Sequence, residues 1–186
     1  GANYQFLPRD EILRFGEIEQ VARSFAALGV SKLRLTGGEP LLRKNLTELI
    51  AKLAGIEGIE DIAMTTNAAL LAKYAIELKA SGLHRVTVSL DSLDAEIFAN
   101  MNGVGAKPAK VIEGIDAALS AGLKLQLHTV VKNGLKIWSR TRGGMPQPVS
   151  VTVSNAYRPG FAQGWARRYS PLITTFTKLT FGVAIR

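Results

Sequence analysis

The sequence predicts an α/β fold built on a parallel β-sheet, and three observations support this. Apolar segments of strand length alternate with amphipathic segments of helical period. The strands begin about 25 to 40 residues apart, which leaves room for one crossover helix between neighbours. Each expected strand also ends in small polar residues. An open doubly wound sheet and an arc of a (β/α) barrel both fit this order, and both place ligands at the carboxyl ends of the strands.

Four strands and five helices are expected in the first 134 residues. The strands are expected at 30–35, 59–64, 84–90 and 123–131. The first helix is expected from Asp10, with Gly29 as its stop, and its apolar face comprises Ile12, Phe15, Ile18, Ala22, Phe25 and Leu28. The other helices are expected after Asn45, at 69–80, after Asp94 and from Pro108.

Two of these helix starts carry capping signals. Asn45 with Glu48 three residues later predicts a capping box. Asp94 precedes a short apolar period and is expected to be an N-cap.

After Gly134 the sequence pattern changes. Residues 1–135 carry 15 Lys/Arg and 15 Asp/Glu, whereas residues 136–186 carry eight Lys/Arg and no acid, so the net charge of +8 belongs to the second part. One strand is expected at 149–153, and one or two more within 172–186. We therefore divide the chain into a core, residues 1–134, and a basic tail of uncertain fold, residues 135–186. We interpret the tail as an out-of-frame or foreign extension.

The composition limits the chemistry that this chain supports. It contains no cysteine and only two histidines, His84 and His128, so we expect neither a thiolate-ligated metal nor a zinc site. No apolar run is long enough to span a membrane, and no signal peptide is visible. We expect a cytoplasmic protein with no membrane or nucleic-acid partner. The chain begins with Gly1, which suggests a fragment.

The segment Thr36-Gly37-Gly38-Glu39-Pro40 is the leading candidate for ligand binding. The two glycines permit a sharp turn with an accessible backbone, and Glu39 adds an acceptor for a cationic group. Similar polar groups end the next three strands, at 65–67, 89–91 and 128–129. The carboxyl ends of parallel strands share one edge of a sheet, so these groups are expected to line one site.

These segments resemble the radical S-adenosylmethionine GTP cyclases of molybdenum-cofactor biosynthesis. The matching residues are Leu-Pro-Arg-Asp-Glu-Ile at 7–12, the segment 28–40 ending in Arg-Leu-Thr-Gly-Gly-Glu-Pro, Thr-Thr-Asn at 65–67, Val-Ser-Leu-Asp-Ser-Leu-Asp at 88–94 and Gly-Ile-Asp-Ala-Ala at 114–118. Gly-Gly-Glu-Pro alone is typical of radical S-adenosylmethionine enzymes in general. The resemblance covers residues 7–134 and implies a partial (β/α) TIM-type barrel.

The resemblance also implies cofactors, a substrate and site residues. A 4Fe–4S cluster would cleave S-adenosylmethionine, and the resulting radical would act on GTP to give the 3',8-cyclo-GTP precursor of molybdopterin. By position, the residues implied for S-adenosylmethionine are Gly37, Gly38, Glu39 and Ser89. Those implied for GTP are Arg34, Thr65 and Gln126. We expect the side chain of Arg34 to point to the inside of the barrel, and Leu33 and Leu35 to pack on the helices.

The sequence departs from the family pattern at several positions. The three cluster cysteines are missing, and so is the second cluster of the C-terminal domain. Gln126 stands where the family has a lysine, His128 where it has an asparagine, and Ala68 where it has a glycine. We therefore expect the chain to be inactive as it stands. The alternatives are a fragment of another radical S-adenosylmethionine enzyme and a non-catalytic half-barrel that binds S-adenosylmethionine or a nucleotide. An unpaired edge strand would favour a homo-oligomer.

Overall fold

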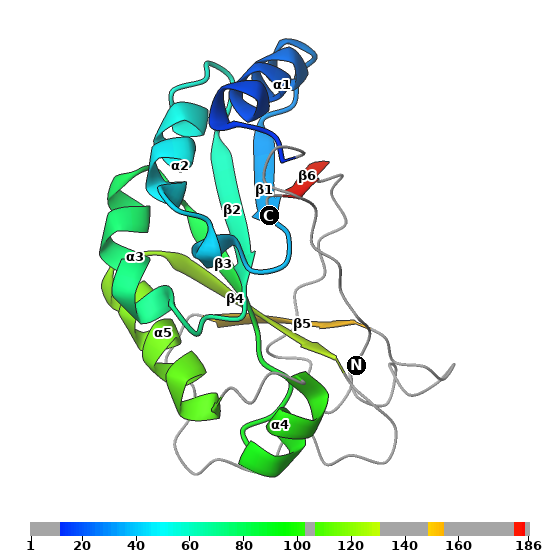
Figure 1. Cartoon of the computed structure of the whole chain (residues 1–186), viewed down its shortest axis with the longest axis vertical. Helices are drawn as coiled ribbons and strands as arrows, with labels where there is room; N and C mark the ends of the chain where they lie inside the picture. The colour runs from blue at the N-terminus through cyan, green and yellow to red at the C-terminus, as the bar shows by residue number, and fades with distance from the viewer. Residues whose placement is uncertain (1–11, 103–106, 131–148, 155–180, 185–186) are drawn as a thin grey trace.

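The computed structural model describes residues 12–102, 107–130, 149–154 and 181–184 (Figure 1). Helices and strands alternate along the core as the sequence predicts. The strands are β1 (Lys32–Thr36), β2 (Asp61–Thr66), β3 (Arg85–Ser89), β4 (Lys124–Val130), β5 (Val149–Ser154) and β6 (Phe181–Ala184). The helices are α1 (Phe15–Ala27), the 3-10 turn η2 (Pro40–Leu42), α2 (Leu46–Ala54), α3 (Leu71–Ala80), α4 (Ala95–Asn102) and α5 (Pro108–Ser120).

The strands form one parallel sheet in the order β5-β4-β3-β2-β1-β6. The four strands expected in the core are all present and lie next to one another in chain order, as in part of a (β/α) barrel. Their register aligns Thr65 with Thr87 and Thr87 with Gln126. Residues of three strands that are far apart in sequence therefore lie side by side.

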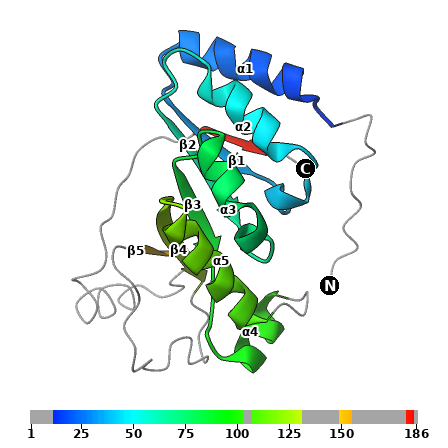
Figure 2. The same ribbon diagram turned by 90° about the vertical axis from the view of Figure 1, so that its left-hand side faces the viewer.

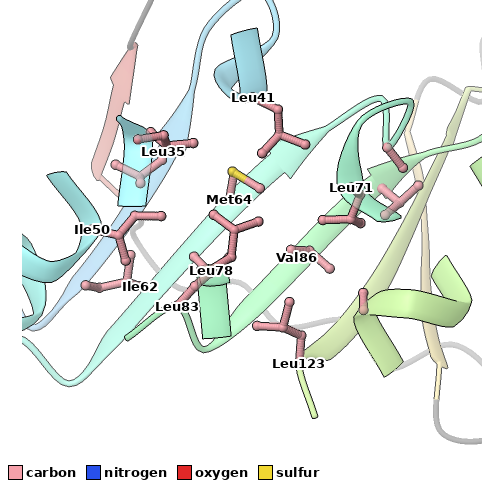
Figure 3. Close-up of a cluster of buried hydrophobic side chains, with 14 of the residues drawn as sticks. Leu35, Leu41, Ile50, Ile62, Met64, Leu71, Leu78, Leu83, Val86 and Leu123 are labelled. Carbon is pink, nitrogen blue, oxygen red and sulfur yellow. The ribbon is translucent and has the colours of Figure 1, made fainter. Parts of the chain in front are cut away.

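Helices α1, α2, α3 and α5 cover one face of this sheet (Figures 1 and 2). A continuous apolar core fills the space between the two layers (Figure 3). It includes Leu35, Ile62, Met64 and Val86 from the strands, and all four side chains are fully buried. No helix in the described ranges is long and apolar enough to cross a membrane.

The opposite face of the sheet is polar, and we call it the polar face. Side chains alternate between the two faces of a strand. In β1, Leu33 and Leu35 belong to the apolar core, whereas Arg34 between them is only partly buried and points away from it. Hydrogen bonds tie the polar-face side chains to one another, and they include Arg34, Thr65, Thr87 and Gln126. The orientation predicted for Arg34 is confirmed.

Two short strands of the basic tail lie at the edges of this sheet. Strand β5 pairs with β4, with Ser150 aligned with Gln126, and β6 pairs with β1, with Gly182 aligned with Arg34. The strand expected at 149–153 is confirmed, and β6 falls within the range expected for a further strand. The division at residue 134 and the foreign origin of the tail stay predictions.

The ends of the first two helices differ from the prediction. Helix α1 begins at Phe15, because the Glu17 carboxylate accepts the backbone N–H of Arg14 at 2.6 Å and closes the first turn there. Leu28 lies beyond the helix end and is 81% exposed, so it is not part of the buried face. The expected capping box at Asn45 is wrong, because Asn45 adopts a left-handed conformation and its side chain makes no capping bond.

The N-cap at Asp94 is confirmed. Its Oδ1 accepts the backbone N–H groups of Glu96 and Ile97, both at 3.0 Å. Pro108 occupies the first turn of α5, also as expected.

Two glycines in helices provide a test of this packing. A Cβ atom at Gly114 in α5 would lie 2.6 Å from the backbone oxygen of Ala68, whereas one at Gly16 in α1 would meet nothing within 4 Å. We expect Gly114→Ala to destabilise the chain by about 1–3 kcal/mol through overpacking. Gly16→Ala should be neutral or stabilising by up to about 0.5 kcal/mol, because alanine favours a helix. Urea unfolding of both variants measures the difference, and equal effects would contradict the close approach of α5 to Ala68.

Candidate functional site

The polar residues at the strand ends gather at one edge of the sheet, as predicted. The segment after β1 is joined to the end of β2 by side-chain hydrogen bonds from Glu39. The ends of β3 and β4 are joined in turn, since the Leu90 N–H donates to the His128 carbonyl at 3.0 Å and the Thr129 hydroxyl donates to the Leu90 carbonyl at 2.9 Å. Register aligns Ser89 with His128 across the same pair of strands. Four successive strands thus contribute to one continuous edge.

The Glu39 carboxylate connects the glycine turn to this edge. Its Oε1 accepts the Thr66 hydroxyl at 2.8 Å and the Leu41 N–H at 3.1 Å, and its Oε2 accepts the Asn67 N–H at 2.8 Å. These three bonds fix the exit of the turn over the end of β2. The carboxylate therefore has a structural function that the sequence did not predict, in addition to any role as an acceptor for a ligand.

The glycine turn itself leaves its backbone accessible. Gly37 has a φ of 156°, and a Cβ atom placed at Gly38 would meet no heavy atom within 4 Å. Open space around Gly38 allows a ligand to approach the main chain directly. The next strand end has a related feature, because Ala68 has a φ of 61°. Glycine adopts this left-handed conformation without strain. The backbone at Ala68 therefore explains why the family that the sequence resembles has a glycine at this position.

Arg34 is the central cation of the polar face. Its Nη1 donates to the Thr65 hydroxyl and to the Thr87 hydroxyl, both at 3.1 Å. The Thr87 hydroxyl in turn lies 3.4 Å from Oε1 of Gln126 and donates to it. The structure thus brings together the three residues that the resemblance implies for GTP, and it adds Thr87 to them.

The charge of Arg34 is not neutralised by a carboxylate among the described residues. Asp61 pairs with Arg85 instead, at 2.7 Å. Burial of the guanidinium, followed by the positive charge of Arg85, lowers the pKa of Arg34 from its ordinary value, and Asp61 opposes this shift. A half-buried cation held only by neutral hydroxyl groups favours an anionic ligand.

Sequence reasoning missed two contributors to this site: Thr87, which binds Arg34, and Arg85, which pairs with Asp61. It placed Thr66 in the site segment 65–67 but did not predict its bond to Glu39. Strand periodicity could have placed Thr87 on the site-facing side of the sheet, because Thr87 lies two residues before Ser89 and residues two apart in a strand share a face. Nothing in the sequence indicates that the hydroxyls would bond to Arg34.

A separate cavity of about 280 Å³ opens on the helical side of the sheet. Residues 41–47 line it together with Tyr74, Glu77 and Leu78 of α3. None of the residues predicted for a ligand lies in this cavity.

The described residues contain no cluster of His, Asp or Glu able to hold a metal ion. The whole sequence contains no cysteine. An iron–sulfur cluster is held by cysteine thiolates, so the residues of this chain do not fit one.

The fold and the site edge define this chain as part of a (β/α) barrel with a Gly-Gly-Glu-Pro turn at the carboxyl end of its first strand. The family model described as the Radical SAM superfamily matches residues 2–139. The chain belongs to this superfamily. The family implies S-adenosylmethionine and a 4Fe–4S cluster, and the cluster ligands are absent from this chain.

Curated proteins similar to this chain carry the name GTP 3',8-cyclase. The chain is 48% identical over 135 residues to GTP 3',8-cyclase of Staphylococcus haemolyticus and 47% identical to that of Staphylococcus carnosus. Each match covers 73% of this chain and 40% of the relative. The chain therefore spans about two-fifths of the length of these relatives.

Solved structures agree on the fold. The crystal structure of Streptococcus suis SuiB bound to S-adenosylmethionine matches with a TM-score of 0.60 at 22% identity, over 72% of this chain and 30% of that one. HydG, a maturase of the [FeFe]-hydrogenase, matches with a TM-score of 0.56 at 15% identity, over 80% and 37%. At these identities the likeness supports the partial barrel alone.

The Glu39 contacts lead to a stability prediction. We expect Glu39→Gln to destabilise the chain by about 1–2 kcal/mol, because an amide group would face at least one N–H or O–H donor that now has an acceptor. Urea unfolding measures the loss, and faster hydrogen exchange at the Asn67 amide should accompany it. Glu57→Gln, at an exposed position, is the matched control and should leave both unchanged. Unaltered exchange at Asn67 in Glu39→Gln would contradict the role of Glu39.

Proposed function

We propose that this chain is a piece of a radical S-adenosylmethionine enzyme that converts GTP to 3',8-cyclo-GTP in molybdopterin biosynthesis. Identity of 46–48% to GTP 3',8-cyclases supports this assignment over that of a more distant radical S-adenosylmethionine enzyme. In this proposal the chain supplies one wall of the substrate site. A cytoplasmic location and association into a homo-oligomer are part of the same prediction.

The proposal rests on the hydrogen bonding and charge pairing of Arg34. Its two Nη1 hydrogens bond to Thr65 and Thr87, and no carboxylate among the described residues pairs with the guanidinium. An arginine has five N–H donors in a planar fork. The remaining donors, on Nη2 and Nε, match two oxygens of a phosphate group. We assign Arg34 to the phosphates of GTP, with Thr65 and Gln126 beside it.

The glycine turn is proposed to receive S-adenosylmethionine. Open space at Gly38 would admit its methionine part to the backbone, and Gly37, Glu39 and Ser89 lie along the same edge. When bound with a reduced cluster, this cofactor supplies a radical. Because the chain lacks cluster ligands, we propose that it binds ligands but does not carry out this chemistry by itself.

Binding of GTP tests the assignment. We expect the 186-residue chain to bind GTP, and Arg34→Met to weaken binding by about tenfold to a hundredfold, as expected for loss of a charge-assisted bidentate contact. Isothermal titration calorimetry with GTP and with guanosine separates phosphate contacts from base contacts, and guanosine affinity should not change.

Arg23→Met is the control for this variant, because Arg23 is a cation on the outside of α1 that pairs with Glu19. It should bind GTP like the unmodified chain. Failure of the unmodified chain to bind GTP would favour one of two alternatives. These are another radical S-adenosylmethionine enzyme and a half-barrel that binds S-adenosylmethionine alone.

Reconstitution with iron and sulfide tests the missing cluster chemistry. We expect the chain to show no iron–sulfur absorption and no cleavage of S-adenosylmethionine after addition of a reductant, because no thiolate is present. Absorption spectra and chromatography of the nucleoside products measure these outcomes. Reductive cleavage by this chain alone would overturn this part of the proposal.

A further inference from the structure

We propose that Thr87 is a positioning residue of this site, which holds the guanidinium of Arg34 with its Nη2 and Nε edge toward the phosphates of a nucleotide. The inference rests on the proposed function and extends it to a residue that does not itself touch the ligand. Thr87 lies in the middle of β3 and is only 5% exposed. It therefore acts from within the sheet, under the guanidinium.

The strand register places Thr87 at the centre of the polar face. It is aligned with Thr65 on one side and with Gln126 on the other. Arg34 reaches it from the strand beyond Thr65, and the two hydroxyl oxygens lie at equal distances of 3.1 Å from Nη1. Both Nη1 hydrogens are thus directed into the sheet, so the planar fork can present only its other edge outward.

The pattern of donors and acceptors gives Thr87 one orientation. An arginine only donates, so both hydroxyls must use a lone pair for Nη1. The single hydroxyl hydrogen of Thr87 then points to Oε1 of Gln126 at 3.4 Å. Gln126 therefore fixes the Thr87 hydroxyl, and the hydroxyl fixes Arg34.

Hydroxyl groups suit this task better than a carboxylate would. They remove rotational freedom from the arginine without cancelling its charge, so less ordering is needed when an anion binds. The nearby carboxylate of Asp61 is held by Arg85 at 2.7 Å, on the amino-terminal side of Thr65. The polar face thus keeps Arg34 charged, partly buried and pre-oriented.

A set of valine and serine variants tests Thr87 in the full chain. Thr87→Val keeps the shape of the side chain and removes the hydroxyl, and we expect it to weaken GTP binding about five- to twentyfold. Thr87→Ser should restore affinity to within about twofold, and guanosine binding should not respond. Ser81→Ala removes a hydroxyl that donates to the Leu78 carbonyl at 2.9 Å, at the C-terminal end of α3 and away from the strand ends that form the site. It should leave GTP affinity unchanged.

A double-mutant cycle separates positioning from a general structural effect. In an Arg34→Met background, Thr87→Val should change GTP affinity by less than about twofold, because no guanidinium remains to be oriented. Equal losses in both backgrounds would overturn the inference, and so would full GTP affinity in Thr87→Val. If the unmodified chain does not bind GTP, the proposed function fails as well. If Arg34→Met weakens binding and Thr87→Val does not, only the role of Thr87 fails.

A measurement on the unmodified chain keeps the inference testable if Thr87→Val does not fold. With Nη1 bonded to two hydroxyls, rotation of the Arg34 guanidinium should be slow, and ¹⁵N NMR should resolve its Nη1 and Nη2 signals. A single averaged signal would overturn the fixed orientation.

Discussion

Alternation of side chains along parallel strands in register is the constraint on which this structure depends. It directs Leu33 and Leu35 into the core and Arg34 to the opposite face. Because β1, β2 and β3 are aligned, the same alternation places the Thr65 and Thr87 hydroxyls within reach of one guanidinium. A slip of one residue in any strand would exchange the two faces and destroy both the core and the site.

Two different kinds of interaction then complete the site edge. Apolar burial holds the helices on one face, and hydrogen bonds from side chains join the strand ends at the carboxyl edge of the sheet. Glu39 ties the glycine turn to β2, and Thr129 ties β4 to β3. The turn can therefore leave open space at Gly38 without losing its position. A rigid edge with an accessible backbone suits a ligand that binds through main-chain groups.

The sequence was sufficient for the order of the elements and for the face on which Arg34 lies, because hydrophobic period and strand alternation are local properties. It failed where a local pattern competes with backbone conformation. Asn45 is a residue type that favours helix caps, but it adopts a left-handed conformation. Helix α1 begins at Phe15, five residues after the expected start, where Glu17 closes its first turn. It could not show that Thr87 binds Arg34, since that contact spans 53 residues of chain. The contacts of Glu39 with Thr66 and Asn67 could not be predicted for the same reason, because these residues lie at the end of another strand.

The central claim is that a phosphate group binds the Nη2 and Nε edge of the Arg34 guanidinium. A crystal structure of the chain with GTP tests it most directly. The account predicts phosphate oxygens within hydrogen-bond distance of Nη2 and Nε of Arg34, with Nη1 still bonded to Thr65 and Thr87. GTP bound in the cavity between residues 41–47 and α3, with Arg34 free of phosphate, would contradict it.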